Sequence, residues 1–359
     1  MWWTLFMIAM SVVFVLDIIY LVFKIGKLLP VKHKKLIALA ILIGFNILFS
    51  IIFSVVNAIV ITLHYVLFYL IFDLIFFIIK KIRKQEYKHD YVTIIVLILV
   101  PIYLGIGMYN EYHVKRTEYT IETNKLNEDL KVVLFSDSHL GVTLNKNNIQ
   151  KQLDRIQDED PDILLIVGDY VDDDTKKEDM IEVTKKIGEI KTKYGIYFVN
   201  GNHDKAYFGE DDRGFSVNDL KEEFKNNGII VLEDESILIN DEFYLIGRKD
   251  YRFKSRKSIE ELTSDLDKDK YMLVMDHQPT DYDNEAKEKV DLVVSGHTHG
   301  GQLIPITYIN TLVSDNYSVY GLTTKEDTNF IVSSGISAWQ IKFKTGCFSE
   351  YVVVNIEKK

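Results

Sequence analysis

The sequence contains a single cysteine, Cys347, among its 359 residues. One thiol excludes an internal disulfide and a zinc site built mainly from cysteines. The sequence also lacks internal repeats and low-complexity segments. Its length allows one large domain and a further segment, because single hydrophobic cores seldom exceed about 300 residues.

Basic residues are scarce in the larger, carboxy-terminal part of the chain. Residues 1–109 hold ten Lys/Arg and four Asp/Glu, whereas residues 110–359 hold 32 Lys/Arg and 48 Asp/Glu. The net charge of −10 therefore divides into +6 and −16. Non-specific binding to nucleic acid depends on Lys and Arg that neutralise phosphates. We therefore expect no nucleic-acid partner.

The first 109 residues consist mostly of long apolar runs. These runs predict four transmembrane spans, at about residues 1–23, 36–56, 60–79 and 91–109. About 20 apolar residues suffice for each crossing. Asn57 and His64 mark the expected reversal between the second and third spans. A cleaved signal peptide is the alternative for the first run, but the basic start and small-residue cleavage site that it requires are missing. The chain is thus predicted to be a multi-pass protein of the cell membrane.

Lysine and arginine are absent from the loop between the second and third spans. Basic residues gather instead at Lys24–Lys35 and Lys80–Lys88, in the loops on the other side of the membrane. Cytoplasmic loops retain such an excess of positive charge, so residues 110–359 are predicted to be extracytoplasmic. Asp17 and Asp73 lie within apolar runs, where we expect them to reach towards interfacial lysines rather than to serve transport.

Residues 110–129 are predicted to form a linker with a first edge strand, and residues 130–359 a separate domain. In this domain, strand-like apolar runs alternate with helix-like stretches, which favours an α/β architecture. Strands are expected near 132–135, 163–167, 196–199, 229–232, 237–239, 243–246, 271–275, 290–294, 329–332 and 349–355. Helices are expected near 146–158, 177–191, 217–227, 257–267 and 281–289.

Five short polar blocks follow five of these strands directly. They are Asp137-Ser138-His139, Gly168-Asp169, Gly201-Asn202-His203-Asp204, His277 and Gly296-His297-Thr298-His299. All five histidines beyond residue 113 lie inside these blocks. The carboxyl ends of strands in α/β sheets are where sites are built. We therefore expect the five blocks to meet in one cleft.

The blocks supply the ligand types of a site for two divalent cations: carboxylates, imidazoles and an amide oxygen. The candidate metal ligands are Asp137, His139, Asp169, Asn202, His277, His297 and His299. Asp137 and His139 are two residues apart after a strand, so both side chains can point in the same direction. Asp169 is the natural bridge between the two ions, and the glycine before it permits close approach of the backbone.

The order Asp-x-His, Gly-Asp-x-x-Asp, Gly-Asn-His-Asp, His and Gly-His-x-His resembles the calcineurin-like metallophosphoesterases over residues 130–355. Gly296–Gln302 and Val332–Ile336 are similar to a membrane-associated branch with amino-terminal transmembrane helices. The resemblance implies a four-layer α/β/β/α sandwich, a dinuclear metal centre and hydrolysis of phosphate esters.

The resemblance also implies a role for each residue. One metal would be held by Asp137, His139 and His299, and the other by Asn202, His277 and His297, with Asp169 shared. His203 would act as general acid, with Asp204 orienting its imidazole ring. Asp172 would have a supporting role beside the ligands. A hydroxide bridging the two ions would attack phosphorus in line, and Mn, Fe, Zn or Co would suit these ligands.

The sequence leaves the substrate, the metal and the oligomeric state open. A phosphodiester or pyrophosphate at the membrane surface is the favoured substrate, with a lipid as one candidate. The alternatives are a membrane sensor or scaffold that retains the fold without turnover, and a protein phosphatase. For Trp339, Lys342 and Lys344, a plain edge strand is favoured over contact with substrate.

Overall fold

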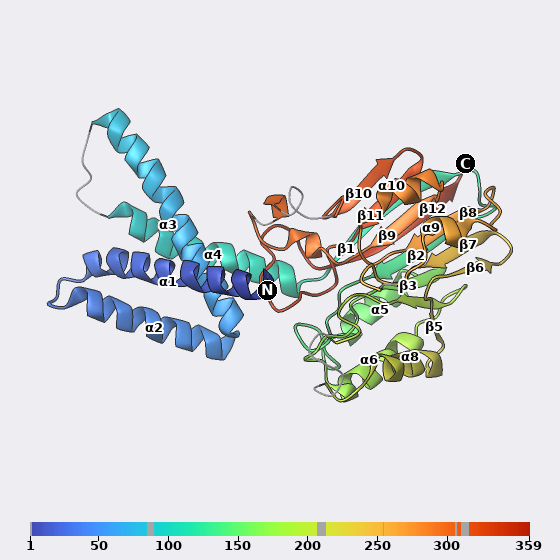
Figure 1. Ribbon diagram of the computed structural model, residues 1–359, viewed down its shortest axis with the longest axis horizontal. Helices are drawn as coiled ribbons and strands as arrows, with labels where there is room; N and C mark the ends of the chain where they lie inside the picture. The colour runs from blue at the N-terminus through green and yellow to red at the C-terminus, as the bar shows by residue number, and fades with distance from the viewer. Residues whose placement is uncertain (1, 85–89, 207–212, 254, 306, 310–315) are drawn as a thin grey trace. The chain divides into compact units, whose positions relative to one another are not determined.

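The computed structural model describes residues 2–84, 90–206, 213–253, 255–305, 307–309 and 316–359, without the side chains of residues 2–10. The chain forms two compact units (Figure 1). The first comprises Met1–Ile106 with Gln340–Lys342, and the second comprises Gly107–Trp339 with Phe343–Lys359.

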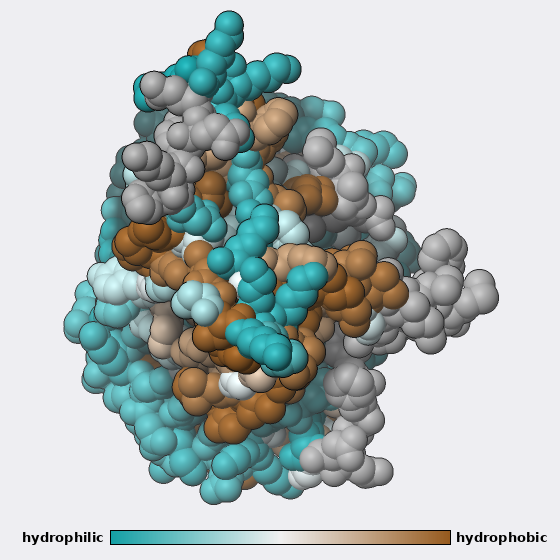
Figure 2. Space-filling view, turned by 90° about the vertical axis from the view of Figure 1, so that its left-hand side faces the viewer, coloured by the Kyte–Doolittle hydropathy of each residue, from teal (hydrophilic) through white to brown (hydrophobic). Residues whose placement is uncertain are grey.

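The first unit is helical within the described residues. Its helices are α1 (Trp2–Leu28), α2 (Lys34–Ile52), α3 (Val55–Arg83) and α4 (Tyr91–Tyr112), the last of which continues into the second unit. Among the described residues, α2, α3 and α4 are long and apolar enough to cross a membrane. Large apolar side chains such as Ile51, Phe77 and Ile106 are exposed along them. Figure 2 shows brown hydrophobic patches on this side of the molecule, with a teal hydrophilic band between them. Such a surface favours a lipid environment.

Three of the four expected spans correspond to these three helices. The first expected span, residues 1–23, falls in α1, where residues 1–10 lie outside the described side chains, and it stays a prediction. The reversal between the second and third spans lies at Phe53 and Ser54, earlier than expected. Ser54 caps α3 by accepting a hydrogen bond from the backbone N–H of Asn57 (3.3 Å). This cap starts the helix at Val55 and places Asn57 in its first turn.

Asn57 is fully buried in the first unit and binds the backbone of Gln340–Lys342. Its Nδ2 donates to the carbonyl oxygen of Gln340 (2.9 Å), and its Oδ1 accepts from the N–H of Lys342 (2.9 Å). One amide therefore satisfies two backbone groups, as a neighbouring strand would.

The two carboxylates of the apolar runs have different surroundings. Asp73 pairs with Lys24 (2.5 Å), as expected from its place near a basic loop. Asp17 was expected to reach a lysine, but it is buried and its Oδ2 lacks a hydrogen-bond partner within the described part of the chain.

The second unit contains two six-stranded sheets. The first has the order β1-β12-β2-β3-β4-β5 and the second β10-β11-β9-β8-β7-β6. The strands of the first are β1 (Lys115–Thr123), β2 (Leu130–Phe135), β3 (Ile163–Val167), β4 (Ile196–Val199), β5 (Ile229–Val231) and β12 (Glu350–Lys358). Those of the second are β6 (Glu235–Ile239), β7 (Phe243–Gly247), β8 (Tyr271–Met275), β9 (Leu292–Ser295), β10 (Gly321–Lys325) and β11 (Thr328–Val332). Strands β2 to β5 pair in parallel, as do β7, β8, β9 and β11.

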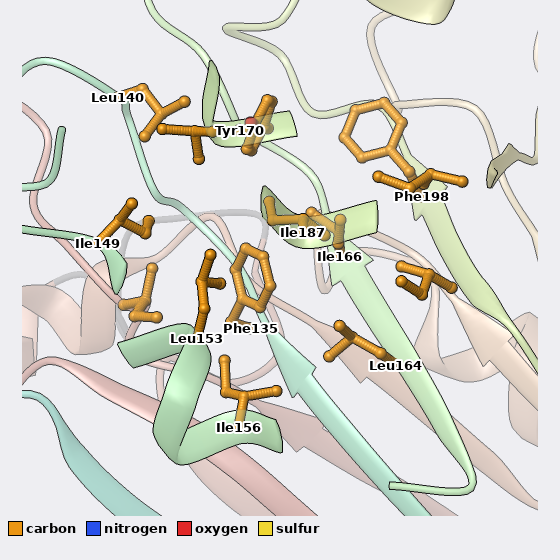
Figure 3. Close-up of a cluster of buried hydrophobic side chains, with 14 of the residues drawn as sticks. Phe135, Leu140, Ile149, Leu153, Ile156, Leu164, Ile166, Tyr170, Ile187 and Phe198 are labelled. Atoms are coloured by element: carbon orange, nitrogen blue, oxygen red, sulfur yellow. The ribbon is translucent and has the colours of Figure 1, made fainter. Parts of the chain in front are cut away.

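The sheets pack face to face, with helices on both outer sides. The helices are α5 (Gln150–Asp158), α6 (Lys177–Gly188) and α8 (Val217–Asn226) on the first sheet, and α9 (Ile259–Thr263) and α10 (Tyr282–Lys287) on the second. Side chains alternate along β2: Val132 and Leu134 pack between the sheets, whereas Val133 and Phe135 pack against helices. Figure 3 shows Phe135 among side chains of α5 and α6. This is the expected α/β/β/α sandwich.

Some element bounds differ from the sequence-based expectation. The helix expected at 146–158 begins only at Gln150. Side chains of Asn145 and Asn148 accept hydrogen bonds from nearby backbone N–H groups, which stabilises a turn before the helix. Residues 110–129 contain the end of α4 and all of β1, which is the expected edge strand. Strand β10 was not expected, because its sequence is short and polar.

Candidate metal centre

The five polar blocks meet at the carboxyl ends of their strands. Strands β2, β3 and β4 of the first sheet carry the blocks at 137–139, 168–169 and 201–204. Strands β8 and β9 of the second sheet carry those at 277 and 296–299. Because parallel strands end at the same edge of a sheet, both sheets deliver ligands to one place.

The first group of candidate ligands is Asp137, His139 and His299, all buried. The Nε2 atoms of His139 and His299 lie 3.2 Å apart. His299 Nε2 lies 3.6 Å from Asp137 Oδ1. Two nitrogen ligands that are each about 2.1 Å from one ion stand roughly 3.0–3.4 Å apart. The spacing of the two imidazole nitrogens fits a shared cation.

The second group is Asp169, His277 and His297, whose ligand atoms lie within 4.8 Å of one another. His277 Nδ1 lies 2.8 Å from the carbonyl oxygen of Val167, which can only accept. The proton therefore resides on Nδ1, and Nε2 remains available for a metal. Nε2 has no hydrogen-bond partner among the described residues and lies 3.1 Å from Asp169 Oδ2. This buried, orphaned nitrogen beside a carboxylate fits a divalent cation.

Asp169 stands between the two groups. Its Oδ2 is 3.1 Å from His277 Nε2 in the second group and 3.8 Å from His139 Nε2 in the first. Its Oδ1 accepts a hydrogen bond from the backbone N–H of His203 (2.8 Å), which fixes the carboxylate. Asn202 lies beside the second group, where its Oδ1 is 3.4 Å from Gln278 Nε2, next in sequence to His277. Six of the seven candidate ligands thus belong to these groups, and Asn202 contacts the residue that follows His277.

His203 lies beside the first group, with Asp172 as its carboxylate partner. His203 Nδ1 is 3.0 Å from Asp172 Oδ1, and Asp172 Oδ2 is 3.2 Å from His139 Nδ1. Asp172 therefore contacts both a candidate ligand and the candidate acid. Burial raises the pKa of Asp172, but its bonds to these two histidines outweigh burial and hold that pKa well below the usual range.

Asp204 takes a different place from the one expected. Its two carboxylate oxygens accept hydrogen bonds from four backbone N–H groups, those of Asp169 (2.9 Å), Tyr170 (2.9 Å), Val171 (3.1 Å) and Gly201 (2.7 Å). The structure thus gives the position beside the His203 ring to Asp172. The carboxylate of Asp204 instead holds two loops together, because it binds the backbone after β3 and the backbone after β4.

Several of these residues have a left-handed backbone that non-glycine residues seldom adopt. Positive φ angles occur at Asp137 (54°), His139 (36°), Asp169 (51°), His297 (70°) and His299 (49°). Each such conformation costs about 1–3 kcal/mol and persists only where the surroundings enforce it. Five of the seven candidate ligands have this conformation, and strained backbone of this kind is often found at functional sites.

Charges within the centre hold its histidines in different protonation states. Burial lowers the pKa of His277, but the charge of Asp169 outweighs burial and holds the pKa well above the usual range. Burial and the charge of His277 lower the pKa of His297 to about 3. Burial, followed by the charges of His139 and Lys344, holds the pKa of His299 well below its usual value. A cation bound beside Asp169 would displace the proton of His277, since metal ligands must be deprotonated.

The region around Trp339 is irregular rather than an edge strand. Trp339 is 39% exposed, and its ring centroid lies 5.2 Å from that of His203. Sequence reasoning gave this tryptophan no firm role, because no pattern connects residues 203 and 339. Lys344 is fully buried, which its charge did not predict.

Comparisons with known proteins find relatives of this chain among the metallophosphoesterases. The family profile described as calcineurin-like phosphoesterase matches residues 130–301. An uncharacterised metallophosphoesterase of Campylobacter jejuni is 30% identical over 244 residues, which cover 67% of this chain and 62% of that protein. One of Aquifex aeolicus is 32% identical over 217 residues, covering 58% of this chain and 79% of that protein.

A transmembrane protein with metallophosphoesterase domain from Danio rerio is 27% identical over 263 residues, covering 68% of this chain. The match spans 57% of that relative's length. Among solved structures, a dimetal phosphatase from Danio rerio has a TM-score of 0.38 at 11% identity, covering 58% of this chain and 88% of that one.

Proposed function

The chain belongs to the calcineurin-like phosphoesterase family, and on that premise we propose that it hydrolyses a phosphodiester or pyrophosphate at the membrane surface with two divalent metal ions. The observation that carries the proposal is that buried ligand atoms of both groups lie close to the Asp169 carboxylate. The separations of 3.1 Å between His277 Nε2 and Asp169 Oδ2, and of 3.2 Å between the Nε2 atoms of His139 and His299, suit two neighbouring ions.

In this proposal the chain's own residues have distinct tasks. One ion would be held by Asp137, His139 and His299 and the other by Asn202, His277 and His297, and Asp169 would serve both. When bound, the ions lower the pKa of a water molecule and neutralise charge on the phosphoryl oxygens. His203 gives a proton to the leaving oxygen, and Asp172 holds the ring by its contact at Nδ1.

An assay of the purified full-length protein with Mn²⁺ tests the reaction. The substrates are bis-p-nitrophenyl phosphate, a diester, and p-nitrophenyl phosphate, a monoester. We expect faster hydrolysis of the diester, and a loss of at least about a hundredfold in kcat for Asp169→Ala and His203→Ala. Equal rates of hydrolysis for the wild type and both variants would refute the proposed enzymatic activity and favour a role as a sensor or scaffold.

Lipid extracts added to the same assay test action at the membrane surface. Competition by phospholipid or glycolipid diphosphate vesicles is expected if the natural substrate is amphiphilic. Unchanged hydrolysis of the soluble diester at saturating vesicle concentration would instead favour a soluble substrate, with the helices acting as a tether.

We also propose that the second unit faces the extracytoplasmic side. The support is the position of the basic residues, which gather where α1 ends and α2 begins, and again at the end of α3. In a Cys347→Ser background, Glu260→Cys places a thiol at an exposed site of the second unit, and Lys34→Cys places one at the exposed start of α2, among the basic residues. An impermeant maleimide is expected to label only the first of these in intact cells. Labelling of the second alone would reverse the orientation.

A further inference from the structure

Glu111 and Lys344 form a buried ion pair near the candidate metal centre. The side chains of both residues are 0% exposed, and Glu111 Oε2 lies 3.8 Å from Lys344 Nζ. Glu111 also accepts hydrogen bonds from the hydroxyls of Thr143 (2.8 Å) and Ser349 (3.2 Å). Buried charges require partners of this kind, because their transfer from water is unfavourable.

The ammonium group of Lys344 also binds the backbone of residues 334 and 335. Its Nζ donates to the carbonyl oxygens of Ser334 (2.7 Å) and Gly335 (3.2 Å). Ammonium groups have three donors and no acceptor, so this side chain binds two successive carbonyls by hydrogen bonds and also lies 3.8 Å from the Glu111 carboxylate. The segment from Ser333 to Ser337, here called the support segment, is therefore held by Lys344 through two of its backbone carbonyls.

The support segment lies directly against a candidate metal ligand. A Cβ added at Gly335 would stand 2.8 Å from the Cβ of Asp137, so only a glycine permits this approach. The backbone N–H of Ile336 donates to the carbonyl oxygen of Ser136 (2.9 Å), next to Asp137. On its other side, the Asp137 carboxylate accepts from the N–H of His297 (3.0 Å). Asp137, with its left-handed φ of 54°, is thus enclosed from two sides.

Glu111 belongs to the last turn of α4, a helix long and apolar enough to cross a membrane. The same end of α4 binds the chain around Lys344 by its backbone. The N–H of Lys344 donates to the carbonyl oxygen of Gly107 (2.9 Å), and the side chain of Asn110 donates to the carbonyl oxygen of Lys344 (3.2 Å). The end of the helix and the support segment are therefore one connected piece of the second unit.

We propose that Glu111 and Lys344 are positioning residues of the phosphoesterase: their ion pair ties the end of α4 to the support segment and so holds Asp137 in place for the metal. The inference rests on the proposed function for the identity of the ligands. It assigns the last turn of the membrane helix a part in metal binding, in addition to attachment.

The test measures Mn²⁺ affinity of the full-length protein in nanodiscs, after chelation, from the free Mn²⁺ signal in electron paramagnetic resonance. Glu111→Gln and Lys344→Met are each expected to weaken the binding of one Mn²⁺ by about tenfold or more. The double variant is expected to recover part of that affinity, because no buried charge remains unpaired. The matched controls are Glu128→Gln and Lys193→Met, which break an exposed pair (3.1 Å) and should leave affinity unchanged.

A merely structural role predicts a different result. In that case the single variants would lower the melting temperature while the folded protein bound Mn²⁺ with wild-type affinity, and the inference would be overturned. Losses that simply add in the double variant would equally overturn the pairing. Should a single variant fail to fold, Glu111→Asp keeps the charge but shortens its reach, and wild-type Mn²⁺ affinity in that variant would contradict the proposal.

The outcome is separable from that of the proposed function. A wild-type protein that binds two Mn²⁺ but hydrolyses neither nitrophenyl ester would refute the phosphoesterase reaction, while the Mn²⁺ affinities of the variants still decided the role of the pair. Hydrolysis by the wild type with unchanged affinity in all variants would sustain the reaction and reject the positioning role.

Discussion

The carboxylate of Asp204 accepts a hydrogen bond from the backbone N–H of Asp169 (2.9 Å). Asp169, the candidate bridge between the two metal ions, is thus fixed in position through its backbone. Three further N–H groups, those of Tyr170, Val171 and Gly201, donate to the same carboxylate. Hydrogen bonds to a charged group contribute about 1.5–3 kcal/mol each. This network connects the loops after β3 and β4.

Asp204→Asn is expected to lower the free energy of unfolding by about 3 kcal/mol or more, because the amide NH₂ would face N–H donors in place of an acceptor. Denaturant unfolding measures this loss. The buffer should lie well above pH 6, since burial and the charge of Asp169 raise the pKa of Asp204 to about 6. The control is Asp154→Asn at an exposed position, and a similar loss in both variants would contradict the assigned role.

Asp172→Asn is expected to change the pH dependence of hydrolysis. Burial lowers the pKa of His203, but the hydrogen bond with Asp172 outweighs burial and raises it. A general acid must be protonated, so activity declines as the pH rises through the pKa of His203. Loss of the Asp172 charge lowers that pKa and moves the alkaline limb of the kcat profile to lower pH.

The measurement is the pH profile of diester hydrolysis at saturating Mn²⁺, which separates this effect from weaker metal binding through His139. His203→Ala provides the comparison, because the alkaline limb assigned to this ring should then disappear. An alkaline limb that stays at the same pH in Asp172→Asn would show that His203 is not the acid.

Gly168→Ala is expected to weaken metal binding, whereas Gly228→Ala is not. Both glycines have nearly the same positive φ, 76° and 75°, so the backbone strain of alanine is matched at about 1–2 kcal/mol. A Cβ at Gly168 would come within 2.6 Å of the His277 ring at Cγ, but a Cβ at Gly228 would meet nothing within 4 Å. Mn²⁺ titration of the two variants separates crowding at His277 and the Gly201 backbone from the backbone strain that both variants share. Equal affinities would exclude an effect of that crowding.

Glu285→Gln is expected to reduce the pH dependence of stability. Glu285 lies buried beside Arg248 (2.9 Å), and burial together with the charge of Asp276 raises its pKa to about 8 from an ordinary value of 4.5. Between these values the folded state retains a proton that the unfolded state releases, so the free energy of unfolding falls as pH rises.

Denaturant unfolding at several pH values between 5 and 8 measures that slope, and the glutamine variant should show a flatter one. Glu260→Gln, at an exposed site of α9, should retain the slope of the wild type. A variant at position 285 with an unchanged slope would mean that this carboxyl is ionised in the folded protein.

The place of the candidate ligands was predictable because each polar block follows an apolar strand, and parallel strands deliver such blocks to one edge. The carboxylate partner of His203 was not predictable in the same way. Asp204 follows His203 in sequence, but consecutive residues of a tight turn point in different directions, and Asp204 points to the backbone of the neighbouring loop. Asp172 reaches the ring from the loop after β3, through a contact that only the fold creates.

Contacts between residues far apart in the chain could likewise not be predicted from the sequence. Glu111 and Lys344 are separated by more than 200 positions and neither lies in a motif. Strand β10 forms because its residues pair with β11, although they are too polar to predict a strand on their own. The start of α3 depended on the cap at Ser54, which apolar periodicity does not reveal.

The hydrogen bonds of the Asn57 amide bear on the number of times that the chain crosses the membrane. It binds Gln340 and Lys342 from the first turn of α3. In the proposed topology, α3 and α4 cross the bilayer in opposite directions and so return the chain to the side on which α3 begins, which agrees with this contact. Whether α1 crosses changes only the side of the amino terminus, because the parity of the later passages is independent of it.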